Sequence, residues 1–397
     1  MSDASARPGP TRWTPALRFV VLVGVMSLFA DFTYEGMRSV SGPYLALLGA
    51  SATAVGVVSG LGELLGYGLR IVSGRLSDRT GQFWPITIAG YVVQMVAVPA
   101  LALAGSWPAA AGLILLERIG KATRNPPRDV MLSHAGKEIG VGWAFGLHEA
   151  LDQAGALIGP LVIALVLALR NDYRLAFAWL VVPAAITLLV LAVARLQYPR
   201  PEELERHPPD VRTEGLPRTF WLYLAAASLV AAGFADFPII AFHFQQAAVV
   251  STPAVPFLYA VAMGLSGLAS LVFGRLFDRT GIRILVPLTI VTAAYAPLAF
   301  LGGPLVAGLG VALWGIGMGV HESIVPAAVA LMAPANRRAS AYGLFTAAYG
   351  IAWFVGSAAM GLLYDVAFPV LIGFAIVAEL AAIPLLLRVR ALMASAA

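Results

Sequence analysis

Cysteine is absent from this chain of 397 residues, which excludes disulfides, thiolate metal sites and cysteine nucleophiles. The chain also lacks a glycine-rich phosphate loop ending in Lys-Ser or Lys-Thr, so it has no motif for ATP-driven pumping. No pattern pairs a nucleophile with a base, and none has the spacing that is diagnostic of a metal site. We therefore expect no enzyme, no cofactor and no metal; an intramembrane enzyme would be the exception to test.

Charged residues are also scarce, at 12%, whereas 59% of the residues are apolar and the mean hydropathy is +0.83. A water-soluble domain has about 45–50% apolar residues, so part of this surface must face lipid. Helices satisfy their own backbone hydrogen bonds in lipid, and about 20 apolar residues span a bilayer. We predict an all-α membrane protein with twelve transmembrane helices. Their apolar runs begin near residues 17, 51, 84, 108, 141, 175, 220, 253, 285, 304, 340 and 369.

One long polar connector separates six predicted helices from the next six. It contains PRPEELERHPPDVRTEGLPR, whose prolines and mixed charges favour an aqueous linker. We expect a tail at 1–16, a six-helix bundle at 17–196, a linker at 197–218, a second bundle at 219–390 and a tail at 391–397.

Arginines indicate the orientation. If the helices alternate in direction, one side receives Arg7, Arg12, Arg18, both copies of the octapeptide described below, the connector, Arg337, Arg338, Arg388 and Arg390. Positive residues favour the cytoplasmic side, so both termini are expected in the cytoplasm, with the chain in the inner membrane. Arg170 and Arg174 are the exception. The net charge of +5 thus reflects topology, and we expect no nucleic-acid partner. The polar tail and the acidic residues that follow argue against a cleaved secretion signal.

An octapeptide recurs about half the chain apart, as GRLSDRTG at 74–81 and GRLFDRTG at 274–281. Further matches lie about the same distance apart, including FADF at 29–32 and 234–237, and AFGL at 144–147 against AYGL at 341–344. An internal duplication explains these matches better than chance does.

Two halves of six helices, each with this octapeptide between its second and third spans, resemble the major facilitator superfamily. The resemblance covers nearly the whole chain and implies two pseudo-symmetric bundles with a substrate site between them. It departs from the family pattern at Gln82 and Phe83, where basic residues are usual. The family's loop latches the cytoplasmic side when the carrier faces outward. The resemblance assigns this role to Gly74, Asp78, Arg79 and Gly81, with Gly274, Asp278 and Arg279 as the second copy. A solvated turn that only fixes topology is the alternative.

A second pattern lies in the fifth predicted helix, where Gly155, Gly159 and Pro160 form GxxxGP. It resembles the family's antiporter motif, although Ile163-Ala164 stands where two glycines usually follow. The resemblance favours export by exchange. Small residues also permit close helix packing, which would explain the same residues without a transport role.

Ionisable residues within spans are costly and should face a water-filled cavity. Asp31, Glu35 and Arg38 fall on one face of the first helix, and its repeat mate offers Asp236 and His243. Two acids one turn apart disfavour each other's ionisation, and we expect Arg38 to favour the charged form. We favour Asp31 as the proton-coupling residue because it alone has an acidic repeat mate. A structural pair that holds the helix to its neighbours is the alternative.

The fourth helix contributes Arg118, which resembles the basic residue of the family's motif for proton coupling or substrate charge. Lys121 to Arg128 approach the cytoplasmic edge, where snorkelling alone would explain them. The fifth and tenth helices add acids and histidines, and a metal-transport site of His148, Asp152 and His321 is one open alternative. The candidates for the substrate cavity are Tyr34, Lys121, His148, Glu149, Asp152, Gln153, His243, His321 and Glu322.

We therefore expect a monomeric secondary transporter that works by alternating access, with protons, lipid and a small-molecule substrate as its partners. Proton-coupled efflux of a small organic compound is the preferred function. A proton-coupled importer, a passive facilitator and a receptor that binds without transporting are the alternatives.

Overall fold

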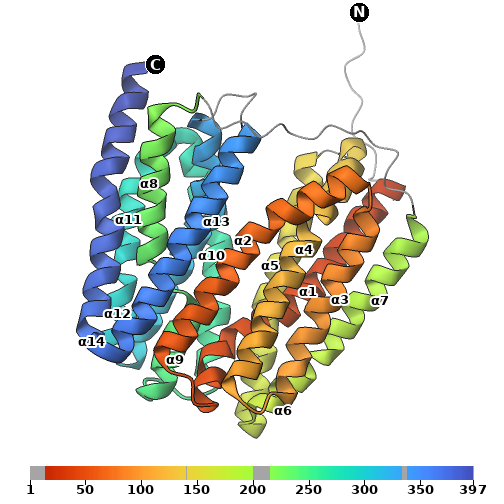
Figure 1. Cartoon of the computed structure of the whole chain (residues 1–397), viewed down its shortest axis with the longest axis horizontal. Coiled ribbons are helices and arrows are strands. Elements are labelled where there is room, and N and C mark those ends of the chain that lie inside the picture. Colours follow the sequence, from red (N-terminus) through yellow and green to blue (C-terminus); the bar gives the residue numbers. More distant parts are fainter. Residues whose placement is uncertain (1–13, 140, 200–214, 333–337, 397) are drawn as a thin grey trace, which may run out of the picture.

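The computed structural model describes residues 14–139, 141–199, 215–332 and 338–396 (Figure 1). Most of the predicted N-terminal tail, most of the linker, Arg337 and the last residue of the predicted C-terminal tail lie outside this part of the chain, as does the side chain of Asp278.

The described part of the first half of the chain consists of helices joined by short connections. Its elements are α1 (Pro15–Leu47), α2 (Ala52–Thr80), α3 (Phe83–Ala100), η1 (Leu101–Leu103), α4 (Trp107–Ile139), α5 (Val141–Arg170), α6 (Tyr173–Trp179) and α7 (Val181–Gln197). We call this set the N half.

The second half repeats the architecture with more interruptions. Its elements are α8 (Arg218–Gly233), α9 (Phe237–Gln246), α10 (Ala254–Thr280), η3 (Gly281–Ile284), α11 (Leu285–Ala293), α12 (Tyr295–Leu301), α13 (Pro304–Met332) and α14 (Arg338–Ala396). We call this set the C half. The two halves stand side by side in Figure 1, and α1 begins at the same face of the molecule at which α14 ends. We call this the termini face and the opposite one the far face.

Ten described stretches are long and apolar enough to cross a membrane. The stretch 341–394 crosses twice, because α14 is bent by the non-helical residue Ala367. Helix α4 is not among the ten, since Glu117, Arg118 and Lys121 interrupt its apolar residues, yet it lies among the other spans. The described chain thus has twelve spans, which confirms the predicted all-α membrane fold.

Local signals set the helix ends. Thr14 and Ser51 accept hydrogen bonds from Leu17 N and Ala54 N, both at 3.2 Å, and so cap α1 and α2. Gly81 closes α2 with a φ of 68°, a left-handed conformation that favours glycine. The last glycine of the octapeptide is therefore explained by the backbone alone.

The halves touch closely toward the far face. A Cβ on Gly42 of α1 would overlap the carbonyl oxygen of Pro238 in α9, and one on Gly56 of α2 would overlap that of Ser357 in α14. At the N-terminal end of α2, which lies at the far face, Asp365 of α14 accepts three hydrogen bonds. Its donors are Ala52 N at 3.1 Å, Thr53 N at 2.7 Å and Thr53 Oγ1 at 2.6 Å. The C half therefore caps a helix of the N half and closes this face.

Candidate functional site: a charged cavity between the halves

Two adjacent cavities lie between the halves, and four residues line both of them. The larger, of about 460 Å³, is lined by parts of α2, α4, α5 and α13 nearest the termini face. The exposed side chains of Glu149 and Glu322 line it, so it opens toward that face. The smaller, of about 110 Å³, lies deeper, among Tyr34, Glu63 and Arg118. Both are lined by Glu35, Arg70, Lys121 and Glu322.

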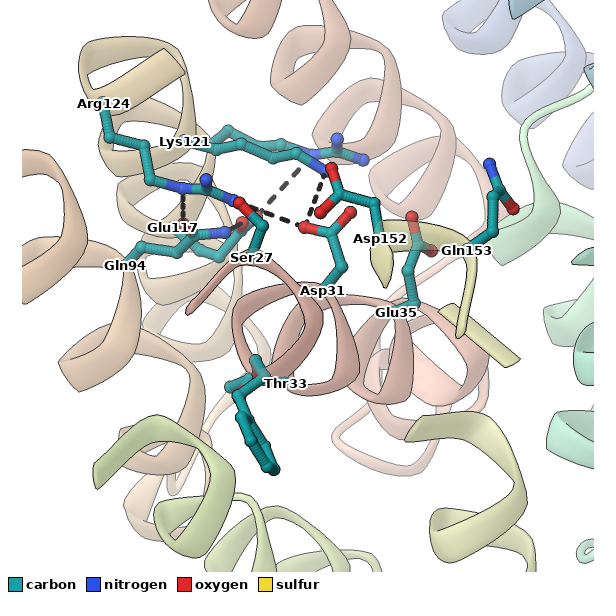
Figure 2. A network of polar contacts seen from close by, with 12 residues as sticks. Ser27, Asp31, Thr33, Glu35, Gln94, Glu117, Lys121, Arg124, Asp152 and Gln153 are labelled. Carbon is teal, nitrogen blue, oxygen red and sulfur yellow. Dashed lines mark hydrogen bonds and ion pairs between the residues drawn. The ribbon is translucent and has the colours of Figure 1, made fainter. Parts of the chain in front are cut away.

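Asp31 is held between two cations on the wall of the larger cavity (Figure 2). Its Oδ1 lies 3.3 Å from Nη2 of Arg124 and 3.8 Å from Nζ of Lys121. Arg124 is fully buried, and it donates to Gln94 Oε1 at 2.6 Å and to Tyr91 OH at 2.8 Å. Snorkelling to the membrane edge is thus wrong for Arg124, because its guanidinium binds inside the bundle.

Arg38 does not form an ion pair with Asp31, contrary to the prediction from their spacing along the helix. Its Nη2 lies 2.7 Å from Oδ1 of Asp236 in the C half and 3.3 Å from Oε1 of Glu63 in α2. Nη2 of Arg118 approaches the same Glu63 oxygen at 2.9 Å. Because Asp236 is only 2% exposed, this chain of charges joins the halves in a largely dry environment.

Asp236 stands where the first span of the C half breaks between α8 and α9. Neighbouring side chains bind the freed backbone groups: Tyr295 OH accepts from Ala235 N at 2.6 Å, and Trp314 Nε1 donates to Ala235 O at 2.8 Å. Helices broken inside a membrane survive only where such partners exist, and they often mark binding sites.

Glu35, the second acid of α1, also has its partner across the interface. The hydroxyl of Tyr259 in α10 donates to Glu35 Oε2 at 2.5 Å. Asp31, Glu35 and Arg38 thus share a helix, but each contacts a different group of neighbours.

Helix α5 presents His148, Glu149 and Asp152, whose ligand atoms lie within 4.8 Å of one another. Within the described residues, the predicted metal alternative is wrong in its third member, because His321 is not part of this group. Ser27 Oγ lies 2.8 Å from His148 Nε2 and accepts from Arg128 at 3.0 Å. A nearby guanidinium makes the group a poor cation site.

The remaining histidines differ in their surroundings. His321 lines the smaller cavity and hydrogen-bonds the hydroxyl of Tyr349. His243 is absent from the lining of both main cavities among the described residues and packs against Phe300, Tyr364 and Phe368. The prediction that His243 lines the cavity is wrong, because α9 directs its side chain toward an aromatic cluster of the C half. Gln153 lines the larger cavity as predicted.

The two sequence motifs lie outside the cavities. A Cβ on Gly155 would overlap the carbonyl oxygen of Leu28, and one on Gly159 that of Phe32, so both glycines let α5 approach α1. Asp78 is exposed and, within the described residues, makes no hydrogen bond or ion pair. A latch that forms only when the termini face closes would leave Asp78 free here.

Sequence reasoning missed several members of the charge network. Glu63 is an acid inside an apolar run, the same signal that drew attention to Asp31. Glu117 of α4 is fully buried and accepts from Gln94 at 2.8 Å. Tyr259 and Gln94 carried no signal, because neutral polar residues are common in membrane helices.

Comparison with known proteins places this architecture. The family model of the Major Facilitator Superfamily matches residues 21–357. An uncharacterized protein of Mycobacterium tuberculosis is 41% identical over 397 residues, covering 98% of this chain and 97% of its own. Multidrug resistance protein MdtH of Edwardsiella ictaluri is 29% identical over 173 residues, covering 44% and 40%. A crystal structure of a peptide transporter POT with sulfate has a TM-score of 0.77 at 14% identity, covering 95% of this chain and 94% of that chain. The last likeness shows the fold alone.

Proposed function

The chain belongs to the major facilitator superfamily, a family of membrane transporters and not of enzymes, and from this premise we propose that it is a proton-coupled antiporter exporting a small organic compound. Its termini face would be cytoplasmic, in agreement with the arginines near the ends of α2, α10 and α14. The cavity would then be open to the cytoplasm, ready to receive a compound for export.

The position of Asp31 carries the proposal. Its side chain is 13% exposed, so water in the cavity can reach it, while two cations hold it in place. A proton on Asp31 would remove the only negative charge that both Arg124 and Lys121 contact in the described structure. Lys121 would then be free to seek another anion, which links protonation to the shape and charge of the cavity.

Two further observations favour export. The GxxxGP pattern of α5 resembles an antiporter motif, and part of the chain is 29% identical to a protein named for multidrug resistance. Both support the direction of transport, and neither names the compound.

The test uses purified protein in liposomes, with the compound that most raises its unfolding temperature in a screen of small metabolites and drugs. Asp31→Asn should lose accumulation driven by a pH gradient while it keeps binding and downhill exchange. Asp129→Asn is the control, because Asp129 also lines the cavity but is 43% exposed and pairs with its neighbour Arg128.

Accumulation by Asp31→Asn at the wild-type level would reject Asp31 as the coupling residue. If exchange by the wild type does not respond to the pH gradient, the protein is a facilitator. Inward accumulation would indicate an importer, and binding without any flux would indicate a receptor.

A further inference from the structure

Four charged residues line both cavities, and we call the region that they border the neck; it contains one charge of each sign that has neither an ion pair nor a hydrogen bond among the described residues. Of the four charged residues that line both cavities, Lys121 pairs with Asp31, and Glu35 accepts from Tyr259. Within the described residues, the side chains of Arg70 and Glu322 make neither an ion pair nor a hydrogen bond. The guanidinium carbon of Arg70 lies 5.7 Å from the ring centre of Tyr67, and its Nε is buried without a hydrogen-bond partner.

The two free charges belong to opposite walls. Arg70 comes from α2 of the N half, and Glu322 comes from α13 of the C half. Most other cations of the cavities are matched: Arg38 by Asp236, Arg118 by Glu63, Arg124 by Asp31 and Arg128 by Asp129. Arg70 is half-buried and Glu322 is exposed, and both line the same two cavities, so a ligand with one charge of each sign would match both of them.

We propose that the transported compound is a small zwitterion, whose carboxylate binds Arg70 and whose ammonium group binds Glu322. The proposal rests on the transport function above and adds the substrate class. A guanidinium presents a fork of donors that matches a carboxylate, and Glu322 offers acceptors to an ammonium group. A compound with only a positive charge would leave Arg70 unmatched, and one with only a negative charge would leave Glu322 unmatched.

The surroundings fit a compound with a modest apolar body. Tyr34, Tyr67, Met318 and Trp353 line the smaller cavity, beside the neck. The larger cavity, at about 460 Å³, falls within the size range of ordinary small-molecule sites, roughly 300–1,000 Å³. A zwitterion that bridges the neck would also connect the two halves, as substrate-dependent rocking requires.

Binding is measured on purified protein in detergent, without any gradient, so that its result does not depend on proton coupling. The probes are the common α-amino acids and their dipeptides, each with its methyl ester, which lacks the negative charge, and its N-acetyl form, which lacks the positive charge. The wild type should bind at least one zwitterion about tenfold to a hundredfold more tightly than both derivatives, as expected for losing a charged hydrogen bond.

The variants assign each charge to its residue. Arg70→Gln should bind the zwitterion and its ester equally, and Arg70→Lys should restore part of the preference. Glu322→Gln should bind the zwitterion and its N-acetyl form equally. Arg75→Gln is the matched control, since Arg75 is an exposed arginine of α2 that lines neither cavity. The ligand-free unfolding temperature of each variant reports whether it folds.

The proposal is overturned if no zwitterion binds, if a derivative binds as tightly as its parent, or if both neutral variants keep the wild-type preference. The last result would assign Arg70 and Glu322 to a gate that pairs when the termini face closes. A zwitterion that binds as described but is not moved by a pH gradient would instead reject the proposed antiport and leave the site intact.

Discussion

At the scale of single residues, each arginine that is buried in the described chain lies beside an acid. Arg118 shows the principle: its guanidinium lies 2.9 Å from Glu63 and 4.8 Å, measured from its central carbon, from the ring centre of Tyr34. Both contacts are made beside the smaller cavity. A set of this kind is harmed most by removing one member, since the other charge stays buried.

Arg118→Ala should therefore abolish active transport and lower stability by about 3–5 kcal/mol, because among the described residues Glu63 would keep an ion pair only with Arg38, at 3.3 Å. Arg118→Lys should retain some transport if charge matters more than the planar fork. Transport assays and thermal unfolding check both variants. The double variant Arg118→Gln with Glu63→Gln separates the effects: it should recover stability but not transport, and a stable, fully active double variant would contradict a role in transport.

The sequence identified many of the charged residues of the site but few of their partners. Spacing along α1 correctly placed Asp31 and Glu35 at the cavity. It could not show that Arg38 pairs with Asp236, because that contact joins α1 to the break between α8 and α9, 198 residues later in the chain. Distant pairs depend on how whole helices are placed, and intrahelical spacing does not report that.

At the scale of elements, α1 and α5 pack with their backbones in close contact. Gly155 and Gly159 face α1 so tightly that a methyl group would overlap its backbone, whereas Gly146 of the same helix has open space around it. The pattern that resembles an antiporter motif therefore has a packing role in this chain, whatever it adds to transport.

Gly159→Ala should destabilise the protein by about 1–3 kcal/mol, as overpacking does, and should lower the unfolding temperature in detergent. Gly146→Ala, the matched control, should leave it unchanged or raise it slightly, because alanine is the better helix former. Equal unfolding temperatures for the two variants would show that α1 and α5 are not packed as described.

Most predicted helix starts lie within two or three residues of the observed ones, yet the interruptions were missed. The break before α9 had a signal in the repeat itself, since Pro238 occupies the place of Thr33 in the unbroken α1. Proline clashes with the carbonyl four residues earlier, here that of Phe234, where α8 has just ended. Comparing the two halves of the sequence for differences, and not only for matches, would have predicted the break between α8 and α9.

At the scale of the whole molecule, the two faces are in opposite states. The far face is sealed by glycine contacts and by the Asp365 cap on α2, while Asp78 at the termini face is free within the described structure. One acid would thus stabilise each end state of the cycle, with Asp365 favouring the present one.

Asp365→Asn should shift the population toward opening of the far face by about fivefold, as expected for about 1 kcal/mol from an exposed charged cap. Asp78→Asn should shift the population toward the present state, in which the far face is closed. Because the chain has no cysteine, a single introduced cysteine can report on opening. Ser41 is 4% exposed and lies beside the contact between α1 and α9. Ser41→Cys should react faster with a thiol reagent in the Asp365→Asn background and more slowly in the Asp78→Asn background. Ser106→Cys, exposed in a loop, is the control.

Unchanged labelling of Ser41→Cys in both backgrounds would show that neither acid governs the equilibrium.

The cap on α2 also makes the transport cycle sensitive to water activity. On opening of the far face, the amides of Ala52 and Thr53 would lose the carboxylate of Asp365, and water would replace it. Opening therefore takes up water, at these amides and in the space that the glycine contacts vacate. A membrane-impermeant osmolyte that is excluded from this space should slow turnover in proportion to its osmotic pressure, and with the Asp365→Asn variant the dependence should be weaker.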